Sequence, residues 1–86
     1  MPTRTVTVGS ASGLHARPAT LVAKAAAAAP GTVLIGRPGT AGTDASSILM
    51  LMALGIGSGE QVELSSDDQP SLDAVAELVA ADLDAA

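Results

Sequence analysis

A single histidine is the residue of this chain best suited to covalent chemistry. His15 lies in the segment Gly13-Leu14-His15-Ala16-Arg17-Pro18-Ala19, where a small polar stretch gives way to an alanine-rich one that predicts a helix. The first amides of a helix have no intrahelical acceptor and carry partial positive charge, so they bind anions such as phosphate. Arg17 adds a planar donor that is always charged. The sequence thus places a nucleophilic nitrogen beside an anion site, which is what a transient phosphohistidine needs.

A plainer interpretation of the same residues stays open on these grounds alone. An isolated His-x-Arg is more often a solvated loop or a helix cap with an ordinary surface arginine beside it. Two other uses of a histidine fit the composition poorly. A catalytic triad needs a nucleophile and an orienting carboxylate around the ring, and zinc needs several ligands, whereas the chain has one histidine and no cysteine. We therefore expect no metal site and no cofactor.

The hydrophobic pattern predicts the elements that position His15. Alternation of apolar and polar residues indicates strands, and runs with helical spacing between capping residues indicate helices. The order is βαββαβα, with strands expected at 3–8, 32–37, 40–43 and 60–66 and helices at 16–29, 48–54 and from Pro70 through Leu83. This order favours an α+β open-faced sandwich, a four-stranded and mostly antiparallel sheet with three helices on one face. At 86 residues we expect a single domain, 1–86.

Composition narrows the classes of partner. The net charge of −5, from nine acidic and four basic residues, argues against nucleic acid, which is bound through clusters of lysine and arginine. No stretch approaches the roughly 20 apolar residues that a membrane span requires, so we expect no membrane insertion. The absence of cysteine suits a reducing compartment, and we expect a cytoplasmic monomer.

The segment from Ile48 to Leu54 is apolar on every side, although a short helix at the edge of a small sandwich buries only one. We expect Leu51 and Leu54 to face the core. Exposed contiguous apolar surface marks interfaces, and methionine adapts to several partners. The remaining side chains therefore predict a docking surface for partner proteins, made by Ile48, Leu49 and Met52 together with Thr20 of the first helix.

Two segments carry a resemblance to a known family. Residues 13–19 resemble, essentially unbroken, the active-site signature of the histidine-containing phosphocarriers of the bacterial phosphoenolpyruvate:sugar phosphotransferase system, and residues 47–56 resemble the second signature of that family. The resemblance implies the same open-faced sandwich. It also implies a protein that is modified during phosphotransfer and is not itself an enzyme. Such a carrier takes a phosphoryl group from Enzyme I onto Nδ1 of its histidine and passes it to sugar-specific IIA domains.

Residue roles follow from the resemblance position by position. His15 matches the phosphoryl acceptor, and Ala16 and Arg17 match the residues that hold the phosphate. Ser47 matches a serine that is a regulatory phosphorylation site in some members, and it is also the expected cap of the second helix, a role worth about 1 kcal/mol. Many relatives have lysine immediately before that serine, whereas this chain has Ser46.

Three alternatives remain at this point. A regulatory or nitrogen-branch paralogue would keep His15 and deliver phosphate to regulators. An acyl carrier, modified on Ser46 or Ser47, would be another small acidic protein, but acyl carriers are helical bundles and the alternating stretches here require a sheet. An interaction module would bind a partner such as a transcriptional regulator through its apolar surface, without using His15 at all. A serine kinase that acts on Ser47 is a separate candidate partner.

Overall fold

The computed structural model describes residues 2–83, and the expected order of elements is confirmed. Alternation of more and less buried side chains is clearest in the strand at 61–65, and alanine-rich or capped amphipathic segments form the helices. In chain order the elements are β1 (Thr3–Thr7), α1 (Ala16–Ala28), β2 (Leu34–Gly36), β3 (Thr43–Asp44), α2 (Ile48–Ala53), β4 (Gln61–Ser65) and α3 (Gln69–Ala80).

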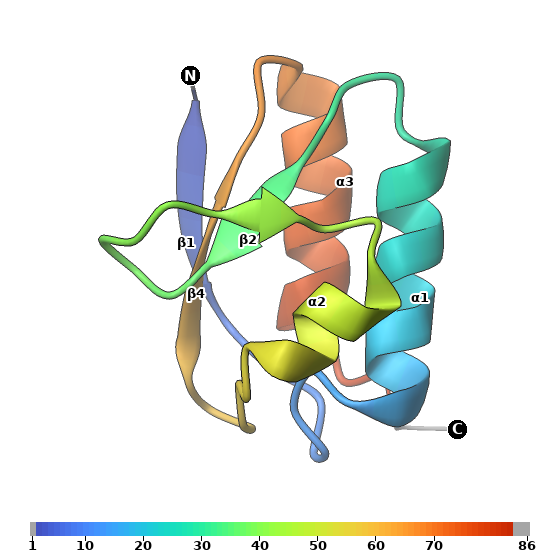
Figure 1. Cartoon of the computed structure of the whole chain (residues 1–86), viewed down its shortest axis with the longest axis vertical. Helices are drawn as coiled ribbons and strands as arrows, with labels where there is room; N and C mark the ends of the chain where they lie inside the picture. Colours follow the sequence, from blue (N-terminus) through green and yellow to red (C-terminus); the bar gives the residue numbers. More distant parts are fainter. Residues whose placement is uncertain (1, 84–86) are drawn as a thin grey trace.

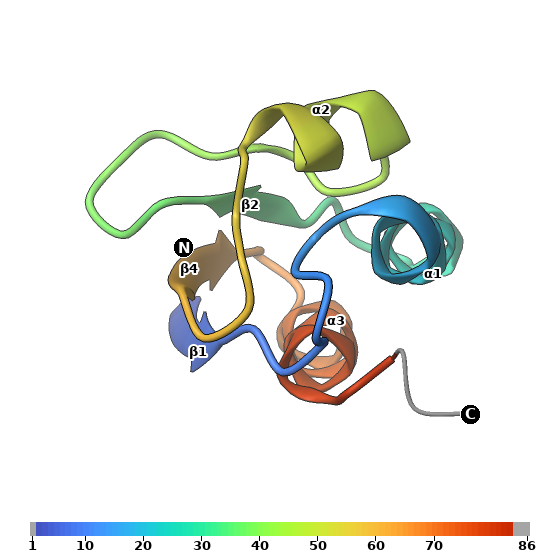
Figure 2. The ribbon, with the colours of Figure 1, turned by 90° about the horizontal axis from the view of Figure 1, so that it is seen from below.

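The four strands form one antiparallel sheet in the order β1-β4-β2-β3. The register pairs Val6 with Val62 and Ile35 with Leu64, which puts the apolar side chains on a common face. The helices lie to one side of this sheet, with α1 and α3 running side by side and α2 next to α1 (Figure 1; Figure 2). The α+β open-faced sandwich predicted from the sequence is therefore confirmed.

The core is aliphatic, and several alanines belong to it. Sheet residues such as Val62 and Leu64 meet Val22 of α1 and Leu72 of α3, all fully buried. Several alanines on the facing sides of the helices are buried as well, because a small side chain lets α1 and α3 approach each other closely. These alanines, which the sequence pattern does not single out, are Ala19, Ala23, Ala26 and Ala76.

Two expected boundaries are off by three residues. The returning strand of the hairpin begins at Thr43 rather than Thr40, because the Thr40 N–H and hydroxyl both donate to the Arg37 carbonyl and extend the turn. The last helix ends at Ala80, so Leu83 continues its apolar spacing but lies beyond it. Within residues 2–83 the structure has no helix long and apolar enough to cross a bilayer.

Candidate functional site

His15 immediately precedes the first residue of α1 and is exposed. Its backbone is extended (φ −138°, ψ 156°), and its side chain makes no capping hydrogen bond to the helix. The first turn of α1 contains no acidic residue. The unpaired amides and partial positive charge of this end of the helix are therefore left to an external anion, beside an imidazole that solvent can reach.

The backbone of Ala16 is unusual. Its φ of +47° lies in the left-handed region, which costs a residue other than glycine about 1–2 kcal/mol. Thr20, one turn further along α1, donates its hydroxyl to the Ala16 carbonyl at 3.1 Å. The chain therefore changes direction sharply between His15 and the helix, and the strain is held at the junction that presents the imidazole.

The loop before His15 is anchored to the segment that follows α2. Gly13 has a φ of +71°, and a Cβ at this position would lie 2.3 Å from the Ile56 carbonyl oxygen, so only glycine fits there. The neighbouring Leu14 N–H donates to that same carbonyl at 3.0 Å. The side chains of Leu14 and Ile56 are both buried. The residue directly before His15 is thus fixed by one backbone hydrogen bond and by packing.

The loop before His15 is also anchored to the end of α3. Ser10 is almost fully buried, and its hydroxyl donates to the Ala81 carbonyl at 3.2 Å while accepting from the Leu83 N–H at 2.9 Å. The Gly9 N–H donates to the Val79 carbonyl at 3.1 Å. Seen from below, this loop crosses from β1 past the end of α3 to the start of α1 (Figure 2). Both ends of the loop are therefore held in place, and His15 follows the second anchor.

Arg17 lies two residues after His15 in the first turn of α1 and is exposed. Arg4 pairs with Asp73 and Arg37 with Glu60, but Arg17 makes no ion pair with any residue from 2 to 83. Its guanidinium is therefore free of internal competition for an anion at the start of the helix.

A short apolar surface adjoins α1. Figure 1 and Figure 2 agree that α2 lies beside α1, and Figure 1 places it at the level of the N-terminal half of that helix. Leu51 is fully buried and Leu54 half-buried, as expected. Four large apolar side chains of α2 remain in solvent and are called the α2 patch below: Ile48 (41% exposed), Leu49 (80%), Met50 (43%) and Met52 (37%).

Met50 is the member of this patch that sequence reasoning missed. Only Leu51 of α2 is fully buried, so both of its chain neighbours point outward. Ser47 caps the same helix as expected, since its hydroxyl accepts from the Met50 N–H at 3.3 Å. Ser47 therefore lies at the rim of the α2 patch, and a change in its charge would act there.

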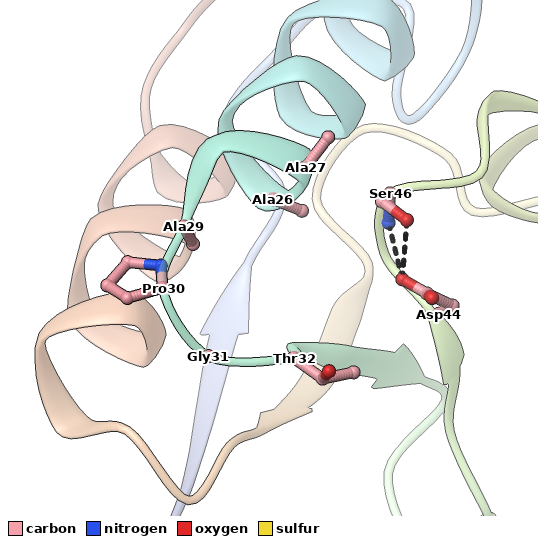
Figure 3. Close-up of a pocket in the computed structure, with 8 residues that line it drawn as sticks. All are labelled: Ala26, Ala27, Ala29, Pro30, Gly31, Thr32, Asp44 and Ser46. Atoms are coloured by element: carbon pink, nitrogen blue, oxygen red, sulfur yellow. Dashed lines mark hydrogen bonds between the residues drawn. The ribbon is translucent and has the colours of Figure 1, made fainter.

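A hollow of about 180 Å³ lies at the opposite end of α1 (Figure 3). Its walls include Ala26, Pro30, Asp44 and Ser46. The Asp44 carboxylate accepts hydrogen bonds from the Ser46 backbone N–H at 2.9 Å and from the Ser46 hydroxyl at 2.7 Å. These two bonds, the backbone one first, hold the pKa of Asp44 below its ordinary value. The length of α1 separates this hollow from His15 by about 20 Å at a rise of 1.5 Å per residue. The hollow is therefore not part of the His15 site.

Comparisons with known proteins agree on one family. The family model described as "PTS HPr component phosphorylation site" matches residues 2–81. The chain is 39% identical over 87 aligned positions to the phosphocarrier protein HPr of Streptomyces coelicolor, covering 98% of this chain and 94% of that one. It is 37% identical over 82 positions to the phosphocarrier protein HPr of Pseudomonas putida, covering 92% and 91%.

Solved structures lead to the same family. A crystal structure of a phosphocarrier protein HPr from Bacillus anthracis superposes with a TM-score of 0.83 at 30% identity, over 91% of this chain and 95% of that one. HPr-C-His from Thermoanaerobacter tengcongensis superposes with a TM-score of 0.82 at 29% identity, over 92% and 91%.

Proposed function

Because this chain belongs to the HPr family of phosphocarriers of the phosphotransferase system, we propose that His15 accepts a phosphoryl group from Enzyme I and passes it to sugar-specific IIA domains. The observation that carries the proposal is the exposed imidazole of His15 at the start of α1, whose side chain does not cap the helix. It lies in a signature that the sequence alone already associates with phosphohistidine.

Each residue of the site has a separate part in the proposed transfer. The bond between phosphorus and its donor breaks as a bond to one imidazole nitrogen, Nδ1, forms, so the phosphoryl group changes carrier without being hydrolysed. The Ala16 and Arg17 amides and the Arg17 guanidinium donate hydrogen bonds to the phosphoryl oxygens, whose charge is spread over them in the transition state. Pro18 lacks an N–H, so it contributes no donor to this group. Exposure of His15 suits this transfer, because donor and acceptor must each reach the same ring.

The proposed docking surface is the α2 patch together with Thr20, which is exposed on α1. An apolar surface with two methionines suits several partners in turn, because methionine adapts its shape to each. A phosphate on Ser47 would add about −1.5 to −2 charges at the rim of this surface and oppose docking. A serine kinase and a transcriptional regulator are therefore further candidate partners. Ser46 is the poorer candidate for modification, since its hydroxyl is already bonded to Asp44.

The proposal describes a carrier, modified and restored in each cycle, rather than a catalyst. We also propose that the chain is a monomer, forms a single domain over residues 1–86 and works in the cytoplasm. Small size and a shallow apolar surface suit brief encounters with larger partners, since small interfaces support the weak and transient end of protein association.

The test is a relay built from purified components. Phosphoenolpyruvate and Enzyme I should place an acid-labile, base-stable phosphate on the wild-type chain and none on His15→Ala. Subsequent addition of sugar-specific IIA domains should remove it. Transfer to nitrogen-branch IIA proteins alone would favour the regulatory paralogue instead, and a wild-type chain that acquires no phosphate would exclude both.

A further inference from the structure

Arg37, at the end of β2, contacts the far end of the docking helix. Its Nη2 donates to the carbonyl oxygens of Leu54, at 3.1 Å, and Gly55, at 3.3 Å. Leu54 is the C-terminal cap of α2, where unpaired carbonyls carry partial negative charge. A guanidinium that bonds two successive carbonyls both neutralises and orients this end of the helix.

Glu60 completes the contact from the other side. One of its carboxylate oxygens accepts from Arg37 Nη1 at 3.0 Å, and the other accepts from the Gly57 N–H. Those hydrogen bonds, with the Gly57 N–H as the larger cause, lower the pKa of Glu60 from its ordinary value. Together Arg37 and Glu60 bind three backbone groups of residues 54–57, a segment outside the regular helices and strands.

The same segment carries the acceptor that holds the residue before His15. Ile56 lies in the middle of it, and its carbonyl accepts the Leu14 N–H at 3.0 Å. Arg37 binds the Gly55 carbonyl, and Ile56 follows Gly55 in the chain. The Ile56 carbonyl accepts the N–H of Leu14, the residue before His15. A shift of residues 54–57 would move both the end of the α2 patch and the loop that presents His15.

We propose that Arg37 and Glu60 are positioning residues for phosphotransfer, acting on His15 and on the α2 patch through residues 54–57. The phosphotransfer step in this inference rests on the proposed function, whereas the contacts of Arg37 and Glu60 with residues 54–57 do not depend on it. Reacting groups that are misplaced by about 1 Å can lose about a hundredfold in rate, so a pair that never touches phosphate can still influence transfer. Neither residue is predicted to touch the phosphoryl group.

The chain contains a matched pair for comparison. Arg4 and Asp73 form an ion pair of 3.2 Å with side chains 41% and 44% exposed, against 3.0 Å with 48% and 44% for Arg37 and Glu60. Exposed pairs of this kind contribute little to stability. The Arg4 pair joins β1 to α3 and makes no contact with residues 54–57. An effect of Arg37 beyond that of Arg4 is therefore not explained by an exposed ion pair alone.

The experiment compares Arg37→Ala, Arg37→Lys and Glu60→Gln with the control Arg4→Ala. For each full-length variant we would measure the unfolding midpoint, kcat and KM for phosphorylation by charged Enzyme I, and hydrogen exchange at the Leu14 amide. We expect Arg37→Ala to lower kcat about tenfold, a loss of about 1.4 kcal/mol in transition-state stabilisation, and to speed exchange at Leu14. Glu60→Gln should show a smaller change in the same direction. Arg4→Ala should leave both quantities at wild-type values.

Several results would overturn the inference. A kcat of Arg37→Ala equal to that of Arg4→Ala would do so, as would full rescue by Arg37→Lys, which keeps the charge but lacks the fork. A rise in KM alone, with Leu14 exchange unchanged, would indicate direct contact with the partner instead. If Arg37→Ala fails to fold, Arg37→Lys and Glu60→Gln decide. If the wild type accepts no phosphate, the proposed function fails, while Leu14 exchange still tests the positioning contact.

Discussion

Replacing Ala16 with glycine should stabilise the folded protein. The left-handed φ of +47° costs alanine about 1–2 kcal/mol, a cost that glycine does not incur. Glycine loses more backbone entropy on folding, about 0.5–1 kcal/mol relative to alanine. The Ala16 side chain is exposed, so little burial is lost with its methyl group. The difference is a gain of up to about 1.5 kcal/mol with a midpoint of about 0.75 kcal/mol, and this midpoint corresponds to about 3–6 °C in Tm for a domain of this size.

The control is the same change at Ala74, an exposed position in the middle of α3. There glycine should cost about 1 kcal/mol, because the alanine already has helical geometry. Thermal and urea unfolding followed by circular dichroism would give both values, with equal m-values showing that the same surface unfolds. The two variants should change the free energy of unfolding in opposite directions. An Ala16→Gly variant that loses stability as Ala74→Gly does would refute the left-handed backbone at the His15 junction.

Further predictions separate docking from folding. Leu49→Asp should change the free energy of unfolding by less than about 0.5 kcal/mol, because Leu49 is 80% exposed, but it should raise KM for Enzyme I. The buried Leu51 should behave differently, since Leu51→Ala should cost about 2–5 kcal/mol of stability by calorimetry. Ser47→Ala should cost about 1 kcal/mol as a lost cap, while Ser47→Asp keeps a cap and should still slow transfer. The pKa of Glu60 is lowered in the folded protein, so its ionised carboxylate stabilises the fold at pH values above the ordinary pKa of 4.5. This contribution disappears as the pH falls through the lowered pKa of the folded state. The unfolding midpoints of the wild type and of Glu60→Gln should therefore converge in acid.

Local signals predicted most of the fold. The alternation of Val62 and Leu64 and the alanine run that ends before Pro30 are strong enough to locate β4 and α1 without tertiary information. The two-residue strand β3 is too short to show a period, so its start was misplaced. Leu83 continues a helical spacing, but the bond from its N–H to Ser10 joins positions that only the fold brings together.

The candidate site divides in the same way. His15 and Arg17 could be proposed as candidate site residues because their chemistry and spacing lie in one short segment. The left-handed backbone at Ala16 leaves no trace in the residue type, since glycine or asparagine would be the usual signal. The contact from Arg37 to Leu54 joins residues 17 positions apart, and nothing in either segment marks the other as its partner.

The central claim is that the transferable phosphoryl group resides on His15. The most direct measurement is nuclear magnetic resonance of the isotopically labelled, full-length chain after charging by phosphoenolpyruvate and Enzyme I. We predict one phosphorus coupled to the Nδ1 nitrogen of the His15 ring, and loss of that coupling when a sugar-specific IIA domain is added. A phosphorus found on Ser47 alone, or a charged chain whose ring nitrogens are unchanged, would contradict the claim.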